Sequence, residues 1–68
     1  MIVTVNGDRR EVPASTTVAS LVELLGVAPD ARGVAVALDG EVVIRGRWTD
    51  TKLVEGSLIE VVSAIQGG

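Results

Sequence analysis

The chain has 68 residues and a net charge of −3, from nine acidic and six basic residues. It contains neither cysteine nor histidine, which excludes disulfides, thiolate or imidazole metal sites and His-based catalytic triads. Apolar residues make up 47% of the chain, too many for a disordered segment. We therefore expect one small domain with a binding or carrier role rather than an enzyme.

The six basic residues are scattered along the chain and Trp48 is its only aromatic side chain, so we expect no nucleic-acid partner. No apolar run approaches the roughly 20 residues that span a bilayer, so no membrane segment is expected. The first residues alternate like a strand without a basic segment before them. We accordingly expect no signal peptide and a cytoplasmic location.

Two β-hairpins are predicted. Residues 1–5 alternate between two faces and lead into Asn6-Gly7, the strongest short hairpin signal, because both residues accept a positive φ. The return strand is expected through residues 10–12, where Pro13 ends it or places it at a sheet edge. Residues 34–38 alternate in the same way, and Asp39-Gly40 leads them into a strand expected over residues 41–45.

One amphipathic helix is predicted over residues 18–25. Residues 15–17 read Ser-Thr-Thr, which are good N-cap types. Gly26 follows the helix as the expected left-handed stop. The apolar side chains between them fall at i, i+3, i+4 and i+7 and form one stripe: Val18, Leu21, Val22 and Leu25.

Residues 58–62 are nearly continuous in apolar character, which suggests a central strand paired on both sides. Residues 46–55 are polar and irregular. One helix must be covered by a sheet of four or five strands, and pairing the two terminal strands in its centre satisfies the element order. The predicted fold is α+β, a ubiquitin-like β-grasp with a mixed four- to five-stranded sheet over residues 1–63 and a flexible, extended C-terminal tail over residues 64–68.

The chain ends in Gln66-Gly67-Gly68. The five residues from Ala64 onward can extend about 17 Å, and glycines lack the Cβ that would block a narrow channel. The terminal carboxylate of Gly68 is ionised at neutral pH, so it is a nucleophile that can be activated. The tail thus reads as a reactive segment, with a frayed end of no function as the alternative.

A docking patch is predicted beside this tail. If one row of strand residues faces the helix, the opposite face carries small apolar side chains, and an exposed apolar area of this kind marks an interaction site. The alternative is that small residues merely suit strand packing. We expect Trp48 to close the rim of the core. Arg45 and Arg47 are expected to be solvated surface residues, with pairing to acidic groups of a partner as the alternative. The predicted patch consists of Ala35, Ala37, Val62 and Ala64.

The chain resembles the ThiS family of sulfur carriers of thiamine biosynthesis. The likeness runs over essentially the whole sequence. It is carried by Val5-Asn6-Gly7, the helix, residues 33–43, Arg45 with Trp48 three residues on, Glu55-Gly56 and residues 59–68. The closing segment 64–68, Ala-Ile-Gln-Gly-Gly, is its most specific part, because Gly-Gly alone also ends ubiquitin and the small subunit of molybdopterin synthase. Ser57 and Ile44 depart from the family, which often has Asp and Pro at these positions.

The resemblance implies that a separate activating enzyme uses ATP to adenylate Gly68. Sulfur relayed from a cysteine desulfurase would then convert Gly68 to a thiocarboxylate, and thiazole synthase would accept this sulfur. The tail that enters the partner active sites would be Ile65, Gln66, Gly67 and Gly68. The chain itself would bind no cofactor or metal and would be a co-substrate, not a catalyst. Three alternatives stay open: a carrier for molybdopterin or another sulfurated product, a ubiquitin-like modifier that forms isopeptide bonds, and a plain interaction module.

Overall fold

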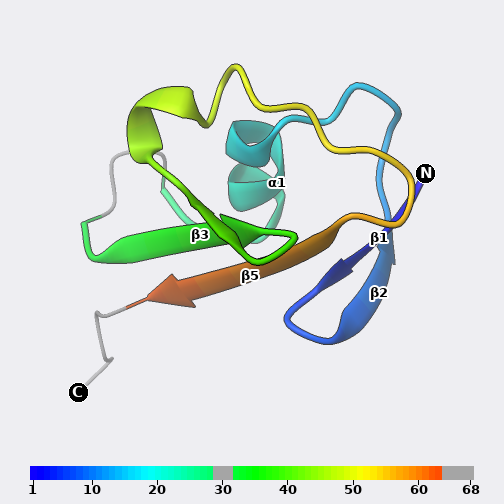
Figure 1. Ribbon diagram of the computed structural model, residues 1–68, viewed down its shortest axis with the longest axis horizontal. Helices are drawn as coiled ribbons and strands as arrows, with labels where there is room; N and C mark the ends of the chain where they lie inside the picture. Colours follow the sequence, from blue (N-terminus) through cyan, green and yellow to red (C-terminus); the bar gives the residue numbers. More distant parts are fainter. Residues whose placement is uncertain (29–31, 64–68) are drawn as a thin grey trace.

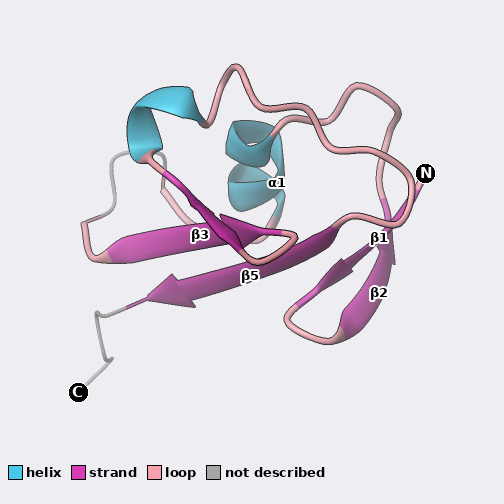
Figure 2. Cartoon of the chain, viewed as in Figure 1, coloured by secondary structure: helices cyan, strands magenta, loops and turns pink. Residues whose placement is uncertain are grey.

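The computed structural model describes residues 1–28 and 32–63 of the chain. A five-stranded sheet in the order β2-β1-β5-β3-β4 is covered on one face by a single helix (Figure 1). Figure 2 shows the same elements by type, with long loop segments passing over the helix. In chain order the elements are β1 (Ile2–Val5), β2 (Asp8–Glu11), α1 (Val18–Leu24), β3 (Val34–Leu38), β4 (Glu41–Val43), the 3-10 helix η1 (Arg45–Arg47) and β5 (Leu58–Ser63).

The two terminal strands lie side by side in the centre of the sheet, as predicted. β1 and β5 run parallel, with Thr4 opposite Leu58 and Val5 opposite Ile59. The other three strand pairs are antiparallel, so the sheet is mixed. A parallel pair needs a long crossover, and here the crossover comprises the helix and the second hairpin. The predicted β-grasp arrangement is confirmed.

Both hairpin turns have the backbone geometry that their sequences demand. Asn6 and Asp39 each have φ of 50°, and Gly7 and Gly40 follow at 87° and 88°. Because the first turn uses only two residues, the return strand resumes at once and spans Asp8–Glu11, earlier than the predicted 10–12.

The helix is confirmed, with a one-residue difference at its end. Thr17 is the N-cap, and its Oγ1 accepts a hydrogen bond from the backbone N–H of Ser20 at 3.1 Å. Leu25, predicted as the last helical residue, is the C-cap, and Gly26 follows in the left-handed region with φ of 85°.

The hydrophobic core lies between the helix and the inner face of the sheet. Alternate residues of β1, β3 and β5 contribute to it together with one stripe of the helix, as the periodicities predict. Trp48 is 4% exposed and closes the core beside η1, which confirms the expected place of the only aromatic ring. The buried core residues are Val3, Val5, Val12, Val18, Leu21, Val22, Val36, Trp48, Leu53 and Ile59.

The strand predicted over residues 41–45 is too long. β4 ends at Val43, and the chain turns through Ile44 into η1. The cause is the burial of Trp48, whose Nε1–H donates to the Val43 carbonyl at 2.8 Å and draws the chain back over the helix. The following segment, predicted as irregular, then crosses the start of α1, where Leu53 N–H donates to the Thr16 carbonyl at 2.9 Å.

Candidate functional site

The sheet face turned away from α1, here called the outer face, carries the candidate site together with the end of β5. β5 ends at Ser63, and the predicted tail residues lie outside the described residues. The predicted tail and the division of the chain at residue 63 therefore stay predictions. The tail residues are Ala64, Ile65, Gln66, Gly67 and Gly68. The structure describes β5, the strand that directly precedes this segment in the chain.

Three of the four predicted patch residues lie together on the outer face. Ala35 is directly opposite Val62 in the β3–β5 pair, and both side chains are exposed, Val62 by 60%. Ala37 lies two residues along β3 from Ala35 and therefore on the same face. Because Ala35 is small, the larger Val62 side chain projects beyond it. A partner can therefore contact Val62 closely.

The register adds one apolar residue that sequence reasoning missed. Val42 of β4 lies opposite Ala37 and is 73% exposed, which extends the apolar surface to the edge of the sheet. Ile44 follows just beyond β4 and is 67% exposed. The signal for Val42 was present in the chain, because a two-residue turn at Asp39-Gly40 already pairs residue 42 with residue 37.

The outer face is not uniformly apolar. Glu60 lies opposite Ala37 in the β3–β5 pair, so an exposed carboxylate interrupts the predicted patch. A shallow depression of about 350 Å³ reaches from Glu60 to the two hairpin turns. It is lined by Thr4, Gly7, Gly40, Leu58, Ile59 and Glu60. A partner that covers this face must accommodate one negative charge among apolar side chains.

The apolar residues of β5 differ in burial between the two faces of the sheet. The strand is paired on both sides, as predicted, and Ile59 is buried against the core. Its neighbours on the outer face, Leu58 and Val62, are 57% and 60% exposed. No element of the described chain covers this second row. Glu60 separates these two side chains on β5, so the contiguous apolar surface that supports docking is formed by Val62 and Ala35 together with Ala37 and Val42.

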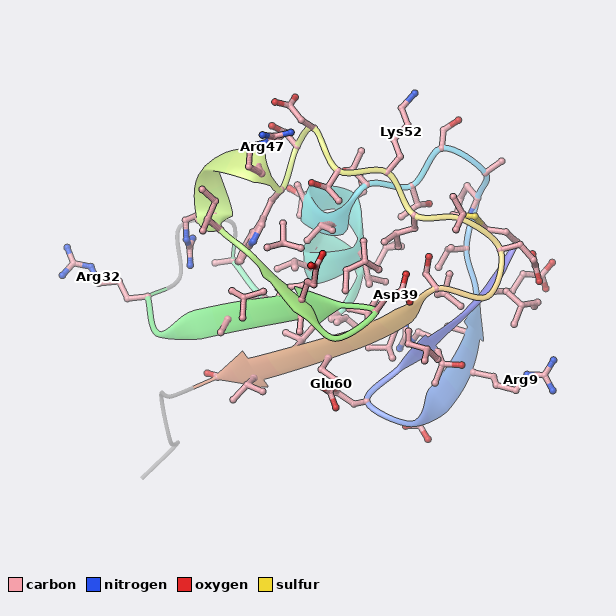
Figure 3. The ribbon with its side chains drawn as sticks, in the orientation of Figure 1. Arg9, Arg32, Asp39, Arg47, Lys52 and Glu60 are labelled. Carbon is pink, nitrogen blue, oxygen red and sulfur yellow. The ribbon has the colours of Figure 1, made fainter. Side chains whose placement is uncertain are left out.

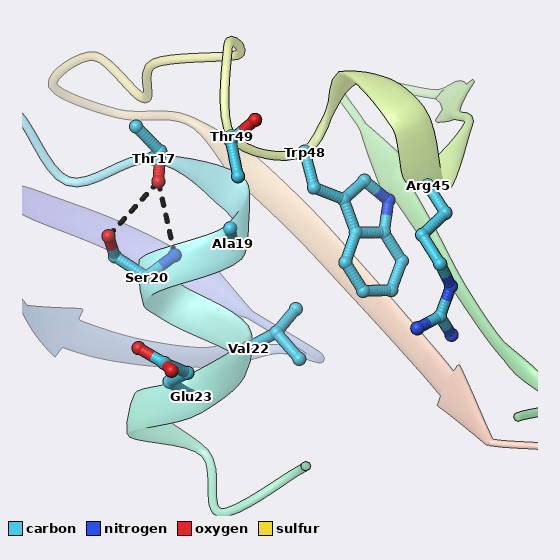
Figure 4. Close-up of a pocket in the computed structure, with 8 residues that line it drawn as sticks. All are labelled: Thr17, Ala19, Ser20, Val22, Glu23, Arg45, Trp48 and Thr49. Atoms are coloured by element: carbon cyan, nitrogen blue, oxygen red, sulfur yellow. Dashed lines mark hydrogen bonds between the residues drawn. The ribbon is translucent and has the colours of Figure 1, made fainter. Parts of the chain in front are cut away.

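Trp48 and Arg45 lie on the other side of the sheet. The Arg45 guanidinium carbon is 4.6 Å from the centroid of the Trp48 ring, a cation–π contact. Figure 4 shows this arginine alongside the indole: Arg45 is exposed, as expected of a surface arginine, and its guanidinium also covers one face of the ring.

A groove of about 450 Å³ lies between α1 and η1 (Figure 4). Thr17 and Ser20 on its rim already bond to each other, with 3.0 Å between their hydroxyl oxygens, as part of the helix cap. Its floor is formed by Val22 and the Trp48 ring. Glu23 and Arg45 also line the groove, and the bond between Thr17 and Ser20 belongs to the cap of α1.

Ser57, a departure from the family pattern, is buried beneath the start of β5. It is 3% exposed, and its Oγ accepts a hydrogen bond from the Val54 backbone N–H at 2.9 Å. A hydroxyl oxygen here serves as the acceptor for a loop amide, a role that a carboxylate oxygen also fills. The difference at position 57 thus affects the hydrogen bond that holds the loop before β5.

Four basic side chains of the described residues lie apart from one another. Figure 3 shows Arg9, Arg32, Arg47 and Lys52 at separate places around the molecule. Within residues 1–28 and 32–63, no group of three or more acidic side chains could hold a metal ion. Across the same parts of the chain, the structure has no helix whose length and apolar character would let it cross a membrane.

The sheet order, the single covering helix and the central parallel pair of terminal strands define a small ubiquitin-like β-grasp protein with an apolar outer face beside the end of its last strand. A family model described as the ThiS family matches residues 3–68. The chain belongs to the ThiS family, which confirms the resemblance found in the sequence.

Solved structures and a curated relative agree with this membership. A crystal structure of the thiamine biosynthesis protein ThiS from Geobacter metallireducens is 36% identical, with a TM-score of 0.82 and complete coverage of both chains. A solution structure of a thiamine biosynthesis protein from the same organism has a TM-score of 0.80 at 36% identity and covers all of this chain and 88% of that one. A thiazole synthase of Paramagnetospirillum magneticum is 37% identical over 68 residues, and this chain spans about a fifth of its length, 20%.

Proposed function

We propose that this chain is a sulfur carrier of thiamine biosynthesis and that the carboxylate of Gly68 is its reacting group. The observation that carries this proposal is the family match, which continues through the C-terminal Gly-Gly to residue 68. The exposed apolar rows beside the end of β5 supply the second support, since a carrier must be held by other proteins.

The chemistry begins with activation of the carboxylate. An oxygen of Gly68 attacks the α-phosphate of ATP in the activating enzyme, pyrophosphate leaves, and an acyl-adenylate forms. The terminal sulfur of a persulfide, supplied through a cysteine desulfurase, then attacks the carbonyl carbon and displaces AMP. A thiol reduces the resulting S–S bond and releases the C-terminal thiocarboxylate. The carrier contributes no base, metal or thiol to these steps, which agrees with a chain that has neither cysteine nor histidine.

Thiazole synthase is the proposed acceptor of the sulfur. The relative named thiazole synthase contains a region similar to this entire chain within one fifth of its own length. Joining a carrier to its acceptor on one polypeptide would raise the effective concentration of the carrier at the acceptor, often to the millimolar range with a short linker. This arrangement in a relative favours thiazole synthase over a molybdopterin enzyme as the partner of the present chain. We propose that the sulfur transfer takes place in the cytoplasm.

Mass spectrometry of the C-terminal peptide tests the proposal. The full-length protein is incubated with the activating enzyme, ATP, cysteine and the desulfurase, and we expect a peptide in which sulfur replaces one oxygen of Gly68. A variant that lacks Gly68 is the control. It should show no such product and should melt at the temperature of the full-length protein, because a chain end contributes little packing. An unmodified terminus in the full-length protein would contradict the proposal, and isopeptide conjugates would instead support a modifier.

A further inference from the structure

The two hairpin turns of the protein are alike in backbone geometry and both reach the central strand with a side chain. Asn6 and Asp39 share a φ of 50° and each precedes a glycine. The Oδ1 atom of Asp39 accepts a hydrogen bond from the Leu58 N–H at 3.0 Å, at the start of β5. Asn6 makes its bonds near the other end of β5, where the C-terminal segment begins.

Asn6 bonds to Val61 through both ends of its carboxamide. Its Oδ1 accepts from the Val61 N–H at 2.9 Å, and its Nδ2 donates to the Val61 carbonyl at 3.1 Å. The two residues are 55 positions apart in the chain. An amide that accepts and donates in this way has the hydrogen-bonding groups of one peptide unit of a neighbouring strand.

The Asn6 side chain extends the hydrogen-bond ladder between β1 and β5 beyond the last backbone bond of β1. The Thr4 N–H donates to the Ser57 carbonyl and the Asn6 N–H donates to the Ile59 carbonyl, both at 2.9 Å. The next bond of a parallel ladder would join Val61 to the backbone carbonyl of Asn6. The backbone instead turns away at its positive φ, and the carboxamide makes the bond.

The hydrogen bonds that β5 makes on its β1 side therefore reach Val61 instead of ending at Ile59. Beyond Val61, the last two residues of the strand are paired by β3, with Ala35 opposite Val62 and Val34 opposite Ser63. Val61 is thus bonded to Asn6 on one side of β5 and lies opposite Val36 of β3 on the other. The exposed Val62 of the outer face is the very next residue.

We propose that Asn6 is a positioning residue that fixes the direction of β5 at its C-terminal end, from which the chain continues into residues 64–68. This inference rests on the proposed function, because it assigns Asn6 a part in presenting Val62 and the reactive tail to the activating enzyme. Without the carboxamide, β5 beyond Ile59 loses its bonds to the β1 side and is held by its pairing with β3 alone. A partner that binds this end of β5 must then fix its position, and that ordering costs part of the binding free energy.

Asn6→Gly is the test variant, because glycine keeps the positive φ of the turn and removes only the side chain. Asp39→Gly is the matched control. It makes the same kind of change in the equivalent turn, with the same backbone φ, but removes a bond at the opposite end of β5. Asn6→Asp is a second variant, which keeps the acceptor for Val61 N–H and loses the donor to its carbonyl.

Amide hydrogen exchange measures the anchoring directly. In Asn6→Gly we expect exchange of the Val61 amide to be on the order of 10-fold faster, as loss of a typical net hydrogen-bond contribution implies. The Leu58 amide should be unaffected in that variant and accelerated in Asp39→Gly instead. Unchanged exchange at Val61 in Asn6→Gly overturns the anchoring role whatever the protein does in the cell.

Steady-state adenylation by the activating enzyme measures the positioning. For Asn6→Gly we expect KM for the carrier to rise roughly 3- to 10-fold, the factor by which loss of one such hydrogen bond changes a population, with little change in kcat. Asp39→Gly should keep the KM of the unaltered protein, and Asn6→Asp should lie between them. An equal rise in KM for both glycine variants would show a general loss of stability and overturn positioning. If the unaltered protein is not adenylated at all, the proposed function fails, while the exchange experiment still decides the anchoring.

Discussion

Replacement of Val62 by aspartate should uncouple partner binding from folding. Val62 is 60% exposed on the outer face, so somewhat more than half of its side chain is available to be buried by a partner. Complete burial of a valine side chain contributes about 1.5–3 kcal/mol, which gives about 1–2 kcal/mol for the exposed part. A carboxylate without a partner in the interface adds a desolvation cost of about 1 kcal/mol or more. The sum of about 2–3 kcal/mol corresponds to binding weakened roughly 30- to 150-fold.

Isothermal titration of the activating enzyme with the variant measures this loss. Val54→Asp is the matched control, because Val54 is 63% exposed but lies in the loop before β5, at the end of the strand remote from Ser63. We expect Val54→Asp to bind like the unaltered protein. Both variants should retain cooperative thermal unfolding, since each aspartate stays hydrated in the free protein. Equal affinities of Val62→Asp and the unaltered protein would refute the assignment of the outer face as the docking surface.

Two further predictions concern the helix side of the molecule. Trp48→Phe keeps a ring in the core but removes the indole donor to the Val43 carbonyl, and loss of this hydrogen bond should cost about 1 kcal/mol. Thermal unfolding should show this as a midpoint lower by roughly 4–8 °C per kcal/mol, and an unchanged midpoint would mean that the bond contributes nothing. Thr17→Ala removes the helix cap and should cost about 1 kcal/mol in urea unfolding, whereas Thr17→Ser should be close to neutral. Similar losses in both Thr17 variants would contradict the capping role.

Local chemistry explains why the hairpins and the helix could be predicted. The Asn6-Gly7 and Asp39-Gly40 turns each require two residues at positive φ, and few other residue pairs accept that backbone. Thr17 and Gly26 mark the ends of the helix for equally local reasons. Given these elements, one helix and five strands leave the β-grasp order as the arrangement that covers the helix.

The features that escaped prediction depend on contacts between distant segments. β4 stops at Val43 because Trp48 enters the core, and nothing within residues 41–45 signals that burial. The position of Glu60 beside Ala37 follows from the register of two strands that are far apart in the chain. The bond from Asn6 to Val61 is a long-range contact of the same kind, and Asn6 otherwise reads only as a turn residue.

The parallel pairing of β1 and β5 separates the N-terminus from the end of the last strand. Met1 lies where the two central strands begin, and its ammonium group donates to the Val12 carbonyl at 2.8 Å (Figure 1). An amide N–H of a longer polypeptide can make this bond equally well. An affinity tag or surface tether attached ahead of Met1 therefore leads away from Ser63. The protein can be immobilised by that end for pull-down or sensor measurements while the opposite end of the sheet stays open to enzymes.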